Sequence, residues 1–168
     1  ARLAAPDLIV AAKENVTVRS GAVLAASGSS ALSGGTLEVS GDGALLRVST
    51  GDAADIARTD TTGAAGVLDL NAGASIQARG SVVFDASAGM KLNAGLDVAG
   101  SAVNVSSSRI SLGSVPDATA GAALDTAQLA SLNARELMLT SASTIDLYGN
   151  VNLSGNALAL RANSIRGI

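Results

Sequence analysis

Pairs of apolar residues separated by one other residue recur along this chain at short intervals, and this pattern constrains the fold more than any other feature. Within residues 90–113 the successive pairs start 6 or 7 residues apart. The pairs are Met90/Leu92, Leu96/Val98, Val103/Val105 and Ile110/Leu112. An apolar residue at every second position indicates a β-strand, and the Gly, Ser and Asn residues between the pairs favour tight corners. Strands this short need stacking partners to be stable.

A longer period of 20–22 residues runs through the same pairs. The string LNAG occurs at 70–73 and again at 92–95. Three further spacings agree: Met90/Leu92 to Ile110/Leu112 is 20 residues, Leu137/Leu139 to Leu158/Leu160 is 21, and Ile145 to Ile165 is 20. Three strand-and-corner units give one such step. The sequence therefore predicts an all-β fold, a right-handed parallel β-helix in which residues 1–168 form one three-sided solenoid segment with about 20–22 residues per coil.

Two stretches, 50–66 and 114–131, interrupt the two-residue period. Each has the length of about one coil, so each is either a degraded coil or a loop or helix that leaves the stack, and the spacing leaves both readings open. The second stretch contains Asp125 followed three residues later by Gln128, which is a capping-box pattern. It predicts a short helix near 126–132.

The composition removes several classes of function. The chain has no cysteine and no histidine, so it lacks disulfides, thiolate metal sites and the commonest general base. The net charge is −3 and the basic residues are scattered, which is unlike a nucleic-acid-binding surface. The apolar runs are too short to span a membrane. We expect no enzyme activity, no catalytic residues, no metal, no cofactor, no nucleic-acid partner and no membrane insertion.

Some polar side chains are nevertheless candidates for a site. Arg47, Asp69 and Lys91 are spaced 22 residues apart, and we expect them to stack as a solvated ladder of alternating charge. Asn71 and Asn93 follow equivalent leucines, and we expect an asparagine ladder at one corner.

Acidic residues were weighed for calcium binding and for acid–base catalysis. Asp52, Asp55 and Asp60 cluster in the first irregular stretch, but their spacing matches no EF-hand, so a solvated loop is the preferred reading. The expected outward-facing acids on strands are Glu38, Asp69, Asp97 and Asp146. Asp69 and Asp97 are expected on different faces, so no pair is placed for acid–base work.

The strings VLDLNAGASIQARGSVVFDASAGMKLNAGLDVAGSAVNVSSSRISLG and LMLTSASTIDLYGNVNLSGNALALRANSI resemble the shaft of filamentous-haemagglutinin-like exoproteins. That family comprises large Gram-negative surface proteins of the two-partner secretion pathway. The resemblance covers 67–113 and 132–168 best and implies a secreted, surface-located virulence factor with a role in cell adhesion or as the stalk of a contact-dependent toxin. It implies an outer-membrane two-partner-secretion transporter and a host-cell receptor or glycan as partners, and it carries over no active-site residue.

The leading hypothesis is a structural or adhesive rod segment, a monomer and an internal piece of a larger chain. Binding is expected at the irregular stretches, because function concentrates in loops on a rigid scaffold. The alternative hypothesis is a β-helical carbohydrate-active enzyme or a phage-tail fragment. Polyuronide cleavage would indicate the enzyme, and a trimer would indicate the phage spike.

Overall fold

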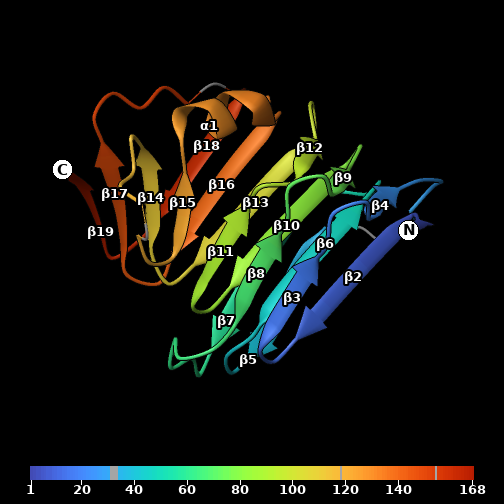
Figure 1. Ribbon diagram of the computed structural model, residues 1–168, viewed down its shortest axis with the longest axis horizontal. Helices are drawn as coiled ribbons and strands as arrows, with labels where there is room; N and C mark the ends of the chain where they lie inside the picture. The colour runs from blue at the N-terminus through green and yellow to red at the C-terminus, as the bar shows by residue number, and fades with distance from the viewer. Residues whose placement is uncertain (31–33, 118, 154) are drawn as a thin grey trace.

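The computed structural model describes residues 1–30, 34–117, 119–153 and 155–168, and it is built mostly of short β-strands in several parallel sheets (Figure 1). Sheet A contains, in spatial order, β1 (Arg2–Ala5), β4 (Val23–Ala26), β9 (Ser75–Gln77) and β12 (Gly95–Asp97). Sheet B contains β18 (Ala157–Arg161), β16 (Glu136–Ser141), β13 (Ala102–Ser107), β10 (Ser81–Ala86), β6 (Ala44–Ser49) and β2 (Asp7–Ala12). Sheet C contains β19 (Ser164–Gly167), β17 (Thr144–Tyr148), β14 (Ile110–Gly113), β15 (Ala122–Leu124), β11 (Gly89–Leu92), β8 (Val67–Leu70) and β3 (Asn15–Val18).

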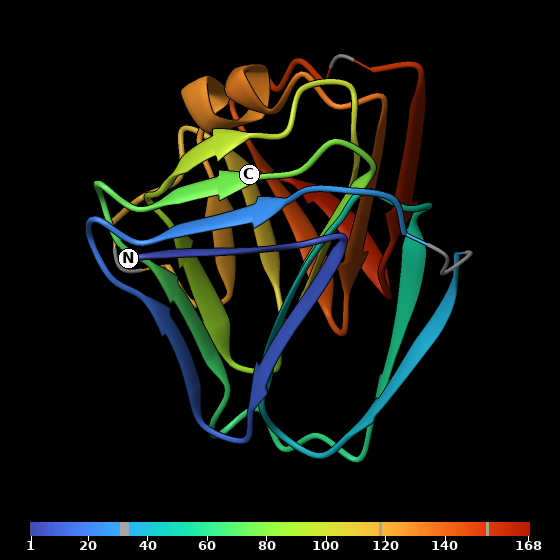
Figure 2. The same cartoon turned by 90° about the vertical axis from the view of Figure 1, so that its right-hand side faces the viewer.

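Sheets A, B and C enclose one core, and the chain visits them in turn as it advances along the long axis (Figure 2). Strands that stack on one another follow the period seen in the sequence. Leu70 pairs with Leu92 at an offset of 22, Leu137 with Leu158 at 21, and Ile145 with Ile165 at 20. The predicted mostly-β class, the parallel pairing and these repeat lengths are confirmed.

The apolar pairs point inward, as the two-residue period predicts. Val103, Val105, Ile110 and Leu112 are buried in the shared core, which is almost wholly aliphatic. Phe84 lies in the same core and is its largest fully buried side chain. Aliphatic residues suit this thin interior because each sheet contributes only a narrow row of side chains to it.

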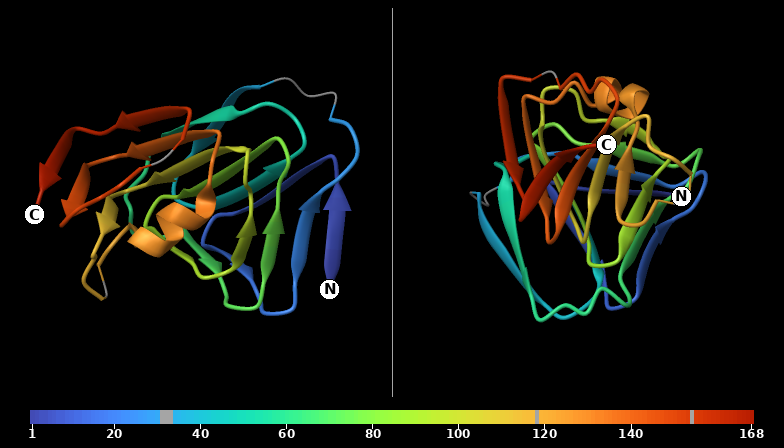
Figure 3. Two further views of the ribbon diagram at one scale, coloured as in Figure 1. Left: turned by 90° about the horizontal axis from the view of Figure 1, so that it is seen from above. Right: turned by 90° about the vertical axis from the view of Figure 1, so that its left-hand side faces the viewer.

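The first irregular stretch, 50–66, leaves the stack as a β-strand. Strand β7 (Ala54–Thr59) pairs in parallel with β5 (Gly35–Ser40), and together they form sheet D outside sheet B (Figures 2 and 3). Between them in sequence, β6 enters sheet B antiparallel to both β2 and β10. The loop reading of 50–66 is therefore wrong over 54–59, and so is an all-parallel stack at this level.

The second irregular stretch, 114–131, combines a loop, a strand and a helix. After β14 the chain returns to insert β15 between β11 and β14, so that Ala122 pairs with both Met90 and Ile110. The 20-residue step from Met90 to Ile110 thus spans two positions in sheet C rather than one. The expected direct stacking of these two pairs is wrong because a third strand occupies the gap.

The predicted helix near 126–132 is confirmed. Helix α1 (Thr126–Leu132) begins at the N-cap Asp125, whose side chain accepts the N–H of Gln128, while the Gln128 side chain accepts the N–H of Asp125. Gln128 Nε2 also donates to Leu92 O at 2.9 Å, and α1 contacts β12 at the end of sheet A. In the described part of the chain, no helix has the length and apolar character needed to cross a membrane.

Candidate interaction site beside the outer sheet

The most distinctive feature is the layer formed by β5 and β7, called here the flap, which covers part of the outer face of sheet B. A second apolar cluster joins the two layers. Leu45 and Val83 on sheet B pack with Ala54 and Ile56 on β7, and Leu37 adds to them from β5. Strands β6 and β10 are consequently buried on both faces, since every residue of both strands is buried.

An ion pair buried between the layers fixes the end of β7. The side chain of Arg58 is 8% exposed and that of Asp85 is 1% exposed. Arg58 donates through Nε and Nη2 to Asp85 Oδ2, and through Nη1 to Gly41 O at 2.7 Å. The second carboxylate oxygen, Asp85 Oδ1, is buried without a hydrogen-bond partner among the described residues. Such a pair is held by its geometry, because each charge alone would be costly to bury.

A second buried arginine anchors the opposite end of the flap. Arg47 Nε and Nη2 donate to the two carboxylate oxygens of Asp7 at 3.0 and 2.8 Å, a bidentate arrangement. Arg47 Nη1 donates to Asp52 O at 3.2 Å, and Ser81 Oγ donates to the same carbonyl at 2.8 Å. The segment that enters β7 is therefore tied to sheet B through its backbone.

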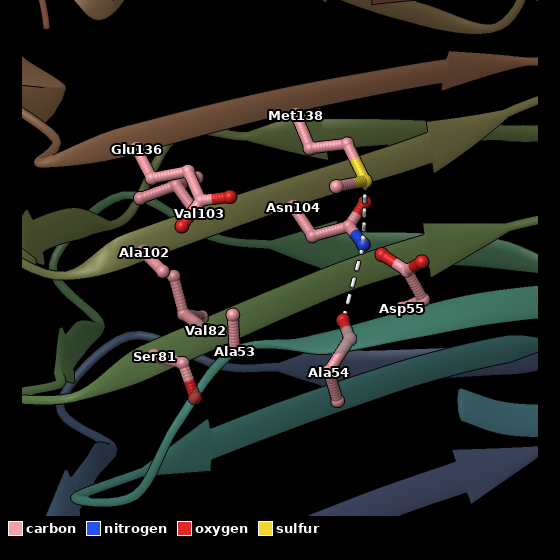
Figure 4. Close-up of a pocket in the computed structure, with 10 residues that line it drawn as sticks. All are labelled: Ala53, Ala54, Asp55, Ser81, Val82, Ala102, Val103, Asn104, Glu136 and Met138. Carbon is pink, nitrogen blue, oxygen red and sulfur yellow. Dashed lines mark hydrogen bonds between the residues drawn. The ribbon is translucent and has the colours of Figure 1, made fainter. Parts of the chain in front are cut away.

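Between these anchors, β7 presents an open edge to a groove along sheet B. Figure 4 shows the end of this groove near Asn104, whose amide lies between Met138 and the carbonyl of Ala54. Asn104 Nδ2 donates to Ala54 O at 3.2 Å, and Asn104 Oδ1 is buried with no partner in the described structure.

The groove widens toward the end of β7, and we call this wider part the flap groove. It is lined by Ile56 and Arg58 from β7, by Ser106 and Ser108 after β13, and by Thr140 and Ala142 after β16. Hydroxyl groups dominate its floor, and it offers no aromatic surface. This arrangement suits recognition of polar groups by hydrogen bonds more than anchoring of a large apolar side chain.

The three aspartates predicted as a cluster do not come together. Asp55 forms an exposed ion pair with Arg161 at 3.4 Å, and Asp60 accepts from the hydroxyls of Ser40 and Thr59. Asp52 contributes its backbone carbonyl to Arg47 and Ser81. In the part of the chain that the structure describes, no three Asp or Glu side chains are placed to hold a metal ion.

The predicted charge ladder is correct at two of its three positions. Asp69 and Lys91 pair in register on the outer face of sheet C. Arg47 lies in sheet B under the flap, so its place in the ladder is wrong. Asn71 and Asn93 do occupy equivalent corners, since their N–H groups donate to the C=O groups of Val18 and Leu70, but within the described residues no side-chain hydrogen bond joins them. The amide ladder is therefore not formed.

The four acids considered for catalysis are spread over three sheets, and this confirms that Asp69 and Asp97 lie on different faces. Asp97 pairs with Arg79 at 2.9 Å, and the hydrogen bonds from Arg79 lower the pKa of the Asp97 carboxyl. Asp146 is buried on the outer face of sheet C and pairs with Arg166. Glu38 is exposed on β5. These carboxylates serve ion pairs and solvation rather than a shared site.

The flap groove itself was missed at the level of sequence. One signal for it exists, because β6 and β10 carry apolar residues at outward positions, Leu45 and Val83, in addition to their inward ones. Strands that are apolar on both faces are covered on both faces. That pattern indicates an additional layer, although it does not indicate which segment forms it.

Comparison with protein-family models, with curated proteins and with solved structures finds no match to this chain.

Proposed function

We propose that this chain is a rod segment of a secreted bacterial surface exoprotein, folded as a right-handed parallel β-helix, which spaces and presents adhesive contacts. The observation that carries the proposal is the stacking of strands in three sheets around one aliphatic core at steps of 20–22 residues. A stack of this kind extends by a fixed rise for each coil, which makes it a rigid spacer.

The distribution of polar groups also supports a binding or spacing role. The buried arginines each have a carboxylate partner and hold the flap in place, and the outward acids lie in separate sheets. A scaffold with a laterally attached layer suits contact with a macromolecule along its side. The resemblance of the repeats to filamentous-haemagglutinin-like shafts leads us to propose the Gram-negative cell surface as its location, and a host-cell receptor or glycan as its target.

The test is attachment of beads coated with the folded chain to cultured host cells and to a glycan array. We expect saturable attachment that soluble chain competes away. Absence of attachment would remove the adhesive role and leave the spacer. Incubation with polyuronides separates the alternative, because release of unsaturated sugars, seen by ultraviolet absorbance, would instead indicate a β-helical carbohydrate-active enzyme.

A further inference from the structure

We propose that the open edge of β7 binds an extended, hydroxyl-rich polypeptide segment of a partner protein, which adds to the flap as a third strand. This inference goes beyond the proposed adhesive role and does not depend on it. The flap has only two strands in the described structure, and β7 pairs with β5 alone. A two-stranded sheet is marginal by itself, and strand addition to an exposed edge is a general mode of peptide recognition.

The backbone of β7 shows which groups are free. Gly41 N–H donates to Thr59 C=O at 2.9 Å, so Thr59 addresses β5. Because backbone polar groups alternate between the two edges of a strand, Ala57 addresses β5 as well, and Ala54, Ile56 and Arg58 address the open side. The bond from Asn104 to Ala54 C=O agrees with this assignment. Ile56 and Arg58 thus present their N–H and C=O groups to the flap groove.

The position beside β7 admits one extended chain. Strand β7 contacts β10 and β13, while β16 and β18 continue sheet B beyond β13. A strand added about 4.8 Å from β7 therefore lies above β13 and β16. A second folded copy cannot bring its own β7 to this place, because its sheet B would collide with β16 and β18. The occupant is consequently a single segment rather than another flap.

The chemistry of the groove indicates the side chains of that segment. Alternate residues of the added strand face Ser106, Ser108 and Thr140, which offer hydroxyl groups and no deep apolar pocket. Small hydroxyl or amide side chains match this floor. Asp85 Oδ1 lies at the same groove without a partner, and Arg58 is already paired, so donors fit better than acceptors. Threonine at alternate positions meets both conditions.

The experiment is a titration of the isotope-labelled chain with an eight-residue peptide of alternating threonine and lysine, followed by NMR. We expect shifts at Ile56, Arg58, Ser106 and Thr140, and at least fivefold slower amide exchange at Ile56 and Arg58, whose N–H groups gain acceptors. A matched peptide N-methylated at every residue, which has no backbone donors, should bind at least about tenfold more weakly.

Two variants complete the test. Thr140→Arg fills the groove and should abolish binding, whereas Thr36→Arg on the exposed part of β5 adds the same charge and should leave binding unchanged. Retained amide fingerprints of both variants show that they are folded. Absence of shifts at millimolar peptide, shifts confined to β5 or to the ends of the sheets, or equal binding of the methylated peptide would each overturn the proposal.

Discussion

At the level of single residues, the flap depends on charges that have been removed from water. Arg58 and Asp85 are both nearly inaccessible, and the pair joins two layers that otherwise meet through a small apolar cluster. Removing one member leaves the other charge buried and uncompensated, which is more costly than losing the pair altogether. The two members should therefore behave very differently when changed singly and together.

We predict that Arg58→Met lowers the free energy of unfolding by about 3 kcal/mol, because it leaves Asp85 without its cation. The double variant Arg58→Met/Asp85→Leu should recover most of this loss. Urea unfolding followed by circular dichroism measures both. Arg79→Met is the matched control, since the Arg79–Asp97 pair is exposed and screened by solvent, and it should change stability far less. Equal losses in the two single variants would contradict a structural role for the buried pair.

Asp42 makes a prediction about pH. Its carboxylate accepts the hydroxyl of Thr62 and the N–H groups of Thr62, Gly63, Ala64 and Ala65. These bonds, the Thr62 hydroxyl first, hold the pKa of Asp42 well below its ordinary value of 3.8.

Because the folded state binds the proton of Asp42 less readily than the unfolded state, the stabilisation is fully present above pH 3.8 and is lost as the pH falls through the lower folded pKa. We expect Asp42→Asn to be less stable than the natural chain at neutral pH, and the difference to shrink below pH 3.8. Urea unfolding between about pH 6 and pH 2 checks this. A difference that stays constant over this range would show that the carboxylate charge is not what matters.

At the level of elements, the sequence predicted the strands and the helix better than their arrangement. The two-residue period is a local property, so inward residues such as Val103 and Leu112 could be identified directly. The Asp125 and Gln128 pattern is also local, and it located α1. The direction of β6 and the position of β7 could not be predicted, because the same alternation describes a strand that runs either way and in either layer. Arg47 was misplaced for that reason.

The junction where the chain leaves the flap depends on one glycine. Gly66 has φ +93°, and an added Cβ would collide with Ser87 Oγ and with the backbone of Gly43. Ser87 Oγ accepts Gly43 N–H at 2.9 Å and lies 2.6 Å from Ala65 O, so this contact joins β6, the flap exit and the end of β10. Space and backbone conformation both exclude a side chain there.

We predict that Gly66→Ala is destabilised by several kcal/mol, whereas Gly100→Ala loses only about 1–2 kcal/mol. Gly100 also has a positive φ, +73°, but an added Cβ would meet nothing within 4 Å. The comparison isolates the steric contribution from the cost of left-handed backbone. Thermal unfolding of the two variants measures it, and equal transition temperatures would show that the Gly66 junction can relax around a methyl group.

At the level of the whole molecule, the ends of the stack are open. Strands β2 and β18 are the edges of sheet B, and β3 and β19 are the edges of sheet C. Large apolar side chains about half exposed lie near these ends: Leu3 and Ile9 at one, and Leu158, Ile165 and Ile168 at the other. Unpaired strand edges with apolar side chains promote pairing with another chain. The lateral surface lacks such a patch, so association should be end to end.

We therefore predict a monomer in dilute solution that forms weak linear oligomers as its concentration rises. The double variant Leu158→Lys/Ile165→Lys should suppress this growth, because charged residues on an edge disfavour strand pairing. Asn93→Lys/Ala99→Lys adds the same charge at exposed positions away from the ends and should leave it unchanged. Sedimentation velocity over a concentration series distinguishes the two. A discrete trimer at all concentrations would contradict end-to-end association and would favour a spike-like assembly in which the rods pack side by side.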